Sequence, residues 1–407
     1  MTGFAASAAH SGNANRPTVD ELDRAAGKRV LHVNELKSPV RIASMELLRA
    51  KSPSSNQFEY LVRVRSSDGA EGLAVANSDR LRDCWPIFLR HVAPFFIGKD
   101  ARSLDDLHWE LYRHNSNYKL QGIALWAPTA AAEFAIFDLL GKLTKQSIGQ
   151  LLGGVVHRDV AIYRASGNRG NTPEAEIAYL KQIVAECGAK ALKFRLGGRM
   201  MRNNQDSLPG RTERLIPLVR EAFGPSMTLY ADSNSSYDVR EAIRLGRLME
   251  KHNYAFYEEP VEFDDLEGTK QVTDALTMPV AGGEQEFSEW RFRWMIHHRA
   301  VDIVQPDLHY YGGFIRTVRV ARMAEAAGMK ITLHMSGGGL GYLDAVHCIS
   351  ALPNALQFQE YKGNSNIPMT CDTSTLAPKD GVVRVPSGPG FGIVIDPEWV
   401  KAGRRVT

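Results

Sequence analysis

From residue 160 onward, short apolar runs alternate with longer segments in which apolar residues recur at helical spacing. The apolar runs read as strands at residues 161–163, 191–195, 228–232, 255–258, 279–281, 302–307, 330–334 and 356–360. Eight strands separated by seven helical segments favour a closed barrel over an open sheet. The pattern therefore predicts an α/β fold, a modified TIM barrel of the (β/α)7β type.

The chain before residue 155 has a different pattern. Residues 40–43 and 60–65 alternate between apolar and polar as strands do, and residues 81–142 turn helical. A sheet followed by helices predicts a separate α+β domain over 36–155. We expect 1–35 to be a peripheral N-terminal extension and 156–378 to form the barrel. The tail at 379–407 has short strands and Pro-Gly turns, and we expect it to pack on the α+β domain.

Composition narrows the class of protein without naming a function. The 407 residues are 44% apolar and 23% charged, with a net charge of +3, as in ordinary globular proteins. This charge balance gives no support for nucleic-acid binding, which would need a clustered basic face. No apolar run approaches the ~20 residues of a membrane span, and no intact secretion signal opens the chain. The four cysteines lack metal-binding spacing. We therefore expect a cytoplasmic protein without membrane or nucleic-acid partners.

Three carboxylates recur at a fixed interval. Asp232, Glu258 and Glu284 are 26 residues apart, and each follows a strand-like run. In a (β/α) barrel the C-terminal ends of the strands meet at one mouth, so the three side chains should converge. Close carboxylates repel one another unless a hard cation lies between them. The spacing therefore predicts a metal site.

Most other barrel strands also end in a polar group. Lys193 and Arg195 are two residues apart and so share a face, as do Asp232 and Asn234. The sixth, seventh and eighth strands end at Asp307, His334 and Glu360. A single charged strand end is usually just solvated. A polar group on successive strand ends instead indicates an active site.

This series of residues resembles the mandelate racemase branch of the enolase superfamily. The motifs are Lys193-x-Arg195, Asp232-x-Asn234, Glu258-Glu259-Pro260, Gly283-Glu284, Pro306-Asp307, His334 and Glu360. The resemblance covers roughly residues 35–400 and implies that the N-terminal domain and the tail together form a capping domain. It also implies Mg²⁺ bound by Asp232, Glu258 and Glu284, with Glu259 outside the ligand set.

The resemblance further assigns roles around the metal. Mg²⁺ would stabilise the enediolate formed when the α-proton of a substrate carboxylate is removed. Asp307 and His334 match the family's His-Asp pair, with Asp307 fixing the imidazole tautomer. Glu360 matches an acid that hydrogen-bonds the substrate carboxylate or the enediolate. Asn234, Lys193 and Arg195 join Glu360 as expected substrate-binding residues.

One departure from the family pattern decides the predicted reaction. Arg195 stands where the family often has a second lysine, and a guanidinium with a pKa above ~12 is a poor base. A racemase needs a base on each face of its substrate, and only His334 is clearly suited to that role. We therefore predict a dehydratase of a sugar acid, an aldonate or aldarate. A racemase or epimerase of a 2-hydroxy acid, with Lys193 as second base, is the alternative.

Two other classes of function fit these residues less well. A metal-binding barrel without turnover would not need the His-Asp pair, and a zinc hydrolase would need histidine ligands on early strands. The resemblance to the family also implies a homo-oligomer.

Several loops bear on the substrate. The loop with Arg199, Arg202 and Arg211 either covers an acidic substrate or is merely solvated. Residues 336–341 are glycine-rich without nucleotide-binding spacing, and we interpret them as a turn that lets the backbone approach substrate. We expect residues 51–57 and 77–80 of the capping domain to set substrate specificity.

Overall fold

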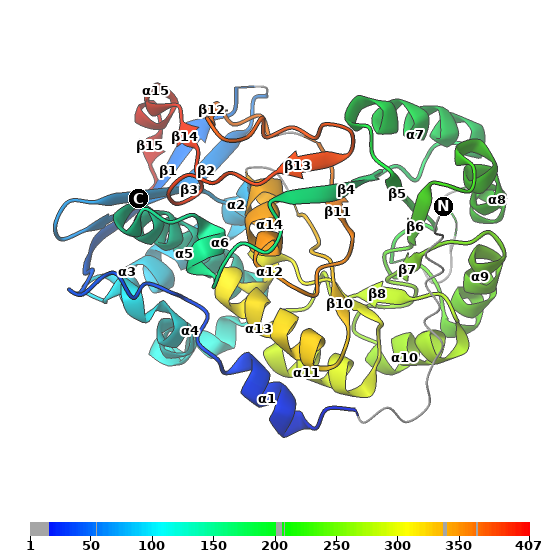
Figure 1. Ribbon diagram of the computed structural model, residues 1–407, viewed down its shortest axis with the longest axis horizontal. Coiled ribbons are helices and arrows are strands. Elements are labelled where there is room, and N and C mark those ends of the chain that lie inside the picture. The colour runs from blue at the N-terminus through cyan, green and yellow to red at the C-terminus, as the bar shows by residue number, and fades with distance from the viewer. Residues whose placement is uncertain (1–15, 54, 201–205, 207, 337–339, 364) are drawn as a thin grey trace.

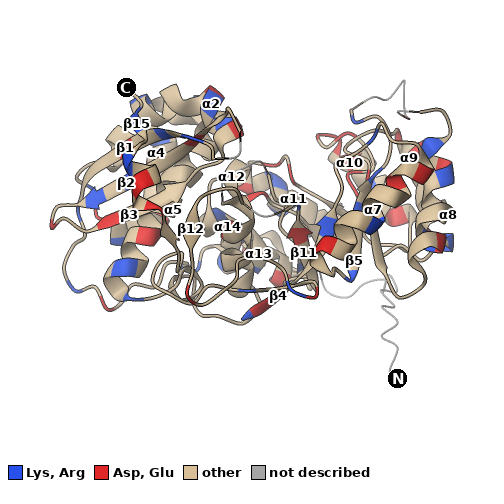
Figure 2. Cartoon of the chain, turned by 90° about the horizontal axis from the view of Figure 1, so that it is seen from above, with Lys and Arg blue, Asp and Glu red and all other residues tan. Residues whose placement is uncertain are grey.

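Figure 1 shows the computed structural model of the chain as two lobes, with β1–β3 in one and α7–α10 in the other. The structure describes residues 16–53, 55–200, 206, 208–336, 340–363 and 365–407. The first lobe is the predicted α+β domain, and the second belongs to the predicted barrel. In Figure 2, basic and acidic residues are interspersed along α7, α8 and α9.

The capping sheet is antiparallel, in the order β15-β1-β2-β3. Its strands are β1 (Ile42–Lys51), β2 (Phe58–Ser66), β3 (Glu71–Val75) and, from the tail, β15 (Arg404–Arg405). One face lies against helix α5 (Ile123–Thr144), and Gly72 permits the close approach. A Cβ at Gly72 would lie 2.1 Å from the Ala135 carbonyl oxygen, so no larger residue fits there.

Shorter helices surround α5 in the capping domain. They are α2 (Ser78–Ile87), α3 (Ala93–Phe96), α4 (Leu104–Arg113) and α6 (Ile148–Leu151), with a π-helical turn at Phe88–Val92 and 3₁₀ turns at Ala101–Ser103 and His114–Leu120. By length and composition α5 could span a membrane, contrary to the expectation that no run comes near that length. Its most apolar window is 89% buried inside the protein, as in the core helix of a globular domain.

The barrel contains eight parallel strands in sequential order. They are β4 (Asp159–Ala165), β5 (Ala191–Arg195), β6 (Thr228–Asp232), β7 (Phe256–Glu258), β8 (Val280–Gly282), β9 (Ile303–Val304), β10 (Lys330–Ile331) and β11 (Phe358–Tyr361). β11 pairs with β4, and a parallel bridge from Ile331 to Ala355 joins β10 to the segment before β11. The sheet therefore closes, which confirms the predicted (β/α)7β fold.

Helices cover the outside of the barrel. They are α7 (Pro173–Cys187), α8 (Arg211–Phe223), α9 (Val239–Lys251), α10 (Leu266–Ala275), α11 (Glu289–His298), α13 (Phe314–Ala326) and α14 (Gly341–Ser350), with the short α12 (Leu308–Tyr311) before α13. Inside the barrel an apolar cluster includes Tyr163, Tyr230 and Phe256, and the last two rings stack at 3.8 Å. This cluster fills the barrel below its mouth, so the polar strand ends lie above a packed apolar interior.

The two ends of the chain pack on different parts of the fold. Helix α1 (Val19–Ala26) begins with a capping box at Thr18 and Glu21, buries Leu22, and contacts α13 and α11. The tail contributes β15 to the capping sheet, pairs β14 (Val394–Ile395) with β12 (Met369–Thr370), and ends in α15 (Pro397–Lys401) and β15. Its β13 (Val382–Arg384) instead pairs antiparallel with barrel strand β4. The tail therefore touches both lobes.

Candidate active site

Strand alternation explains why the polar strand ends face the barrel interior. Tyr230 on β6 lies in the interior cluster, so Asp232, two residues later, points to the same side. The same relation links Phe256 to Glu258 on β7 and Ala191 to Lys193 on β5. In the parallel register Arg195 lies beside Asp232, and Asp232 lies beside Glu258. The apolar pattern of the strands therefore places the charges.

The structure brings Asp232, Glu258 and Glu284 together. Each offers a carboxylate oxygen, and these oxygens all lie within 4.8 Å of one another. All three side chains are buried. Glu284 follows Gly282 and Gly283, and Gly283 has a φ of +112°, which turns the chain at the end of β8. Three buried carboxylates at this separation form a candidate centre for a hard cation.

Lys193 is enclosed by carboxylates. Its Nζ lies 2.6 and 2.8 Å from the two oxygens of Glu258 and 2.8 Å from Glu360 Oε1, and the side chain has no exposed surface. Burial alone would lower the pKa of Lys193, but Glu258 and Glu360 outweigh burial and raise it. The ammonium in turn holds the pKa of Glu258 below its usual range against the effect of burial. Lys193 is therefore a fixed cation here.

A second cationic group contacts Asn234. Arg195 forms an ion pair with Asp232 and donates to Asn234 Oδ1 at 3.1 Å, and Arg169 also donates to that oxygen. The Asn234 amide nitrogen donates to Glu259 at 3.0 Å. Burial, with Arg195 and Arg199 nearby, lowers the pKa of Arg169 to about 9. The Asn234 amide thus links the guanidinium groups to the carboxylates.

Glu259 departs from the simple alternation used for the strand. β7 ends at Glu258, and Glu259 has a φ of +41°, so its buried carboxylate also reaches the mouth beside Asn234. Burial and the neighbouring Glu284 raise the pKa of Glu259 well above its usual value. Glu259 is not among the three clustered ligands.

Asp307 and His334 form a hydrogen-bonded pair. His334 Nδ1 lies 2.7 Å from Asp307 Oδ2, and Asp307 Oδ1 accepts the backbone N–H groups of His309 and Tyr310. Burial opposes ionisation of Asp307, but the bond to His334 lowers its pKa overall. With Nδ1 directed at a carboxylate, the other ring nitrogen, Nε2, faces the mouth, 3.3 Å from Glu284 Oε2. The pair therefore presents a basic nitrogen beside the three carboxylates.

Glu360 lies between two lysines. Lys193 contacts Oε1, while Lys362 lies 3.2 Å from Oε2, which also accepts the Met335 N–H at 2.8 Å. Burial would raise the pKa of Glu360, but the two lysines lower it well below its ordinary value. The Glu360 carboxylate is therefore ionised in this arrangement.

The capping domain reaches the mouth through the start of α2. Asn77 donates to Ser336 Oγ at 2.8 Å, and Arg80 donates to the Tyr310 hydroxyl at 3.0 and 3.2 Å. The Tyr310 ring centre is 6.2 Å from that of His334. Residues 77–80, expected to set specificity, thus lie close to the predicted base.

The arginine-containing loop and the glycine-rich segment, both expected near the substrate, are described only in part. Arg211, buried at the start of α8, donates to the carbonyl oxygens of Asn171 and Arg195, so it is neither solvated nor directed at a ligand. The Arg199 backbone N–H donates to Ser236. Arg202 and residues 337–339 of the glycine-rich segment lie outside the described residues.

Sequence reasoning missed three groups at this site. Gln305 donates to Glu258 at 2.7 Å, and Lys362 lies 3.1 Å from His334 Nε2. Gln305 stands two residues before Asp307, and Lys362 stands two residues after Glu360. The rule that residues two apart share a strand face, which paired Lys193 with Arg195, therefore covers both. The third group, Arg169, lies on the loop after β4, where no strand period positions it.

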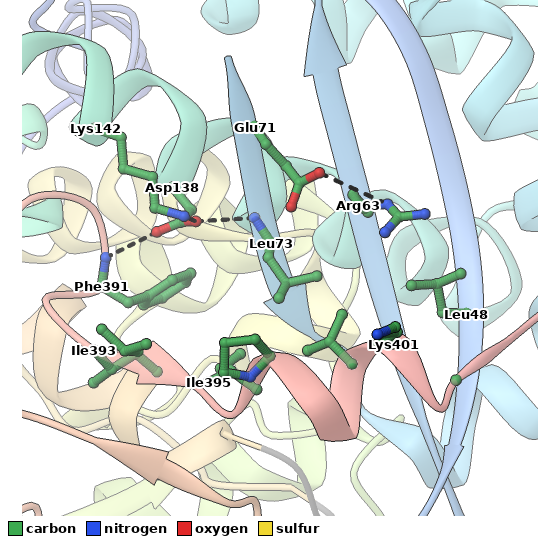
Figure 3. Close-up of a pocket in the computed structure, with 14 residues that line it drawn as sticks. Leu48, Arg63, Glu71, Leu73, Asp138, Lys142, Phe391, Ile393, Ile395 and Lys401 are labelled. Carbon is green, nitrogen blue, oxygen red and sulfur yellow. Dashed lines mark hydrogen bonds and ion pairs between the residues drawn. The ribbon is translucent and has the colours of Figure 1, made fainter. Parts of the chain in front are cut away.

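A separate cavity of about 520 Å³ lies in the capping domain (Figure 3). Its lining includes Leu73, Asp138, Phe391 and Ile395, and none of the predicted site residues. The Asp138 carboxylate accepts from the backbone of Leu73 and of Phe391. These bonds tie α5 to β3 and to the tail, which is a structural role.

The three clustered carboxylates fit a hard divalent cation. Mg²⁺ takes oxygen ligands, and these side chains supply only oxygens. Among the described residues, no hydrogen-bond donor is assigned to Glu284 Oε2, although His334 Nε2 is 3.3 Å away. A buried carboxylate oxygen without a donor is costly, and a bound cation would satisfy it.

The chain belongs to the mandelate racemase / muconate lactonizing enzyme family of the enolase superfamily. Residues 29–153 match the family's N-terminal domain, and residues 176–399 match the domain described as enolase C-terminal domain-like. The two matched segments correspond to the capping lobe and to most of the barrel with part of the tail.

Curated relatives are similar over most of the chain. An arabinonate dehydratase from Saccharolobus solfataricus is 27% identical over 86% of this chain and 92% of its own length. A D-galactarolactone cycloisomerase from Agrobacterium fabrum is 30% identical over 89% of this chain and 94% of its own. An L-talarate/galactarate dehydratase from Salmonella typhimurium is 30% identical over 74% and 73%.

Solved structures share the fold. A protein from Roseobacter denitrificans, described only provisionally as a racemase, has a TM-score of 0.81 and 34% identity, covering 90% of this chain and 99% of its own. A mandelate racemase/muconate lactonizing protein from Paracoccus denitrificans, solved with magnesium, has a TM-score of 0.81 and 27% identity, covering 90% and 98%.

Proposed function

We propose that this protein is a Mg²⁺-dependent dehydratase of a sugar acid, an aldonate or aldarate. The observation that carries the proposal is the 2.7 Å contact between His334 Nδ1 and Asp307, which leaves the other ring nitrogen, Nε2, beside Glu284 of the three carboxylates. The two other basic side chains predicted for the site, Lys193 and Arg195, form ion pairs with Glu258 and Asp232. A single base suits proton abstraction on one face followed by loss of water.

Asp232, Glu258 and Glu284 would hold the Mg²⁺. When bound, the ion would supply positive charge that binds the substrate carboxylate and stabilises the negative charge that develops after proton loss.

The protein's own residues would perform the proton transfer. Asp307 holds His334 in the tautomer with a basic Nε2, which takes the α-proton. Lys193, Arg195 and Asn234 bind and orient the substrate's oxygen atoms. Glu360 was expected to hydrogen-bond the substrate carboxylate or the enediolate, but as an ionised carboxylate it can only accept, so it holds Lys193 in place and accepts from substrate hydroxyls. The departing β-hydroxyl also needs a proton, and protonated His334 is one donor on that face.

The relatives support the substrate class. Those similar over most of this chain include dehydratases named for arabinonate, talarate or galactarate, xylonate and rhamnonate. The sugar acids in those names carry a hydroxyl next to a carboxylate and a second hydroxyl one carbon further on. Elimination of water needs that pattern.

A racemase or epimerase of a 2-hydroxy acid is the second candidate. Lys193 would be its second base, and the similarity to the Roseobacter denitrificans protein favours it. Against it, the Lys193 ammonium is bound to both Glu258 oxygens and to Glu360, so it would have to leave these partners to take a proton.

A screen of the Mg²⁺-loaded protein would test the proposal. The panel is arabinonate, galactarate, talarate, rhamnonate, gluconate, galactonate and xylonate, with 2-keto acid detected as its semicarbazone. We expect keto acid from at least one member. We expect His334→Asn to lower that rate by ~10²–10⁴-fold, the usual contribution of a general base. Replacing the exposed His114 in the same way is the control.

Other outcomes point to the alternatives. Exchange of the α-proton in deuterated water without keto acid would favour the racemase. Ligand affinity that His334→Asn leaves unchanged, with no turnover by the parent protein, would indicate a barrel that only binds.

A further inference from the structure

Lys362 is a cation beside the predicted base that the proposed reaction has not yet used. It follows β11 and stands two residues after Glu360, so it points toward the same mouth. Its Nζ lies 3.1 Å from His334 Nε2 and 3.2 Å from Glu360 Oε2, and it also contacts the Met335 carbonyl oxygen. Lys362 therefore lies at the atom that would take the α-proton.

Lys362 differs from the other lysine on Glu360 in its access to substrate. The Lys193 side chain has no exposed surface, whereas that of Lys362 is 30% exposed. The two ammonium groups contact different oxygens of the Glu360 carboxylate. Lys193 also contacts Glu258, whereas Lys362 contacts His334 Nε2. A ligand that enters the mouth can thus reach Lys362 without displacing Lys193.

The position of Lys362 matches the leaving group of an elimination. His334 donates from Nδ1 to Asp307, so Nε2 is the nitrogen that accepts a proton. A substrate that presents its α-hydrogen to Nε2 also brings the oxygen on the neighbouring carbon close to that nitrogen. Because Nζ is 3.1 Å from Nε2, this oxygen comes within reach of the ammonium.

We propose that Lys362, and not protonated His334, gives the departing β-hydroxyl its proton. This inference rests on the proposed function. His334 takes the α-proton, and the electron pair of the C–H bond moves into the substrate carboxylate. In a second step the carbon–oxygen bond breaks, and that pair forms the double bond between the α- and β-carbons. The oxygen leaves as water with a proton from Lys362 Nζ.

The contact between the two nitrogens also restores the site. After elimination His334 carries one extra proton and Lys362 lacks one. Transfer from Nε2 to Nζ over 3.1 Å returns both groups to their starting states. The enol that remains becomes the 2-keto acid by moving its hydroxyl proton to the β-carbon. The net change is loss of one water, and no other reactant is needed.

The test separates proton abstraction from elimination. It uses the full-length Mg²⁺-loaded enzyme in deuterated water, with the panel member that the parent protein converts fastest. Lys362→Met should lower keto acid formation by ~10²-fold or more, the scale of general acid catalysis. The recovered substrate should nevertheless gain deuterium at its α-carbon at a rate comparable to parental turnover, because His334 is intact. His334→Asn should lose both.

Two further measurements separate a proton donor from a structural residue. A substrate analogue with fluorine in place of the β-hydroxyl loses fluoride without a proton, so Lys362→Met should process it nearly as fast as the parent. Lys362→Arg keeps the charge but gives up a proton poorly, since its pKa exceeds ~12, so it should behave like Lys362→Met. Lys330→Met, at the exposed start of β10, is the matched control.

Three results would overturn the inference. Unchanged keto acid formation in Lys362→Met would show that Lys362 is not needed. An equal fall in exchange and elimination would show that Lys362 only positions His334. No keto acid from the parent protein on any panel member would refute the proposed function itself, and the inference with it.

Discussion

At the scale of single residues, Asn234 and Glu259 at the mouth adopt an unusual backbone conformation. Asn234 and Glu259 have φ values of +40° and +41°, and each follows a clustered carboxylate at the end of a strand. A left-handed conformation in a residue other than glycine costs ~1–3 kcal/mol and tends to occur at functional sites. Here it turns both side chains toward each other, with Asn234 donating to Glu259 at 3.0 Å.

The clustered carboxylates yield a prediction that does not depend on turnover. Glu284→Gln removes one of the three negative charges that would bind Mg²⁺ and should weaken its affinity by about tenfold or more. Titration calorimetry of the full chain with MgCl₂ measures this. Glu267→Gln, at an exposed position on α10, is the control. Equal affinities in the two variants would place the ion elsewhere.

At the scale of elements, the contact between α14 and the tail contains a buried histidine. His347 has no exposed surface, and its Nε2 donates to the Phe391 carbonyl oxygen at 3.0 Å. Burial, only partly offset by that bond, lowers the pKa of His347 from 6.5 to about 4. The folded protein therefore keeps this histidine neutral at a pH where the unfolded chain protonates it.

The sign of the pH effect follows from that difference in protonation. Below pH 6.5 the unfolded state binds more protons at His347, so the free energy of unfolding falls until about pH 4, by up to about 3 kcal/mol. His347→Gln should show a flatter profile over this range. Urea unfolding at several pH values measures the difference, with His114→Gln as the exposed control. Parallel profiles for the parent and His347→Gln would contradict the assignment.

At the scale of the whole molecule, the capping lobe completes the barrel mouth. Arg80 and Asn77, at the start of α2, contact Tyr310 and Ser336 of the barrel, residues more than 200 positions later in the chain. A substrate bound beside His334 would therefore lie against both lobes. For the proposed function we expect the barrel to supply the proton-transfer residues and the cap to select the substrate.

This division predicts separate effects on binding and chemistry. Arg80→Ala should raise KM by about tenfold, the loss of one charged hydrogen bond, while kcat changes much less. Arg82→Ala, two residues further on and exposed, is the matched control. Steady-state kinetics on the best panel substrate would measure both. A fall in kcat alone would place Arg80 in the chemistry instead. A homo-oligomer and a cytoplasmic location stay predictions at this scale.

The sequence by itself determined the barrel and the convergence of its polar strand ends. Each barrel strand was found within a few residues of its predicted position, because apolar side chains must face a core and the βα period repeats. The rule that residues two apart share a strand face then paired Lys193 with Arg195 and Asp232 with Asn234, and all four side chains are buried. Gln305 and Lys362 obey the same rule, two residues from Asp307 and Glu360.

Only the tertiary structure decided which groups touch. No periodicity predicts that Lys193 would lie between Glu258 and Glu360, that Lys362 would reach His334, or that Arg169 would come in from a loop. The burial of α5, the pairing of β13 with β4 and the contact of Arg80 with Tyr310 are likewise long-range. The physical reason is that strand alternation acts over a few residues, whereas these contacts depend on how distant elements pack.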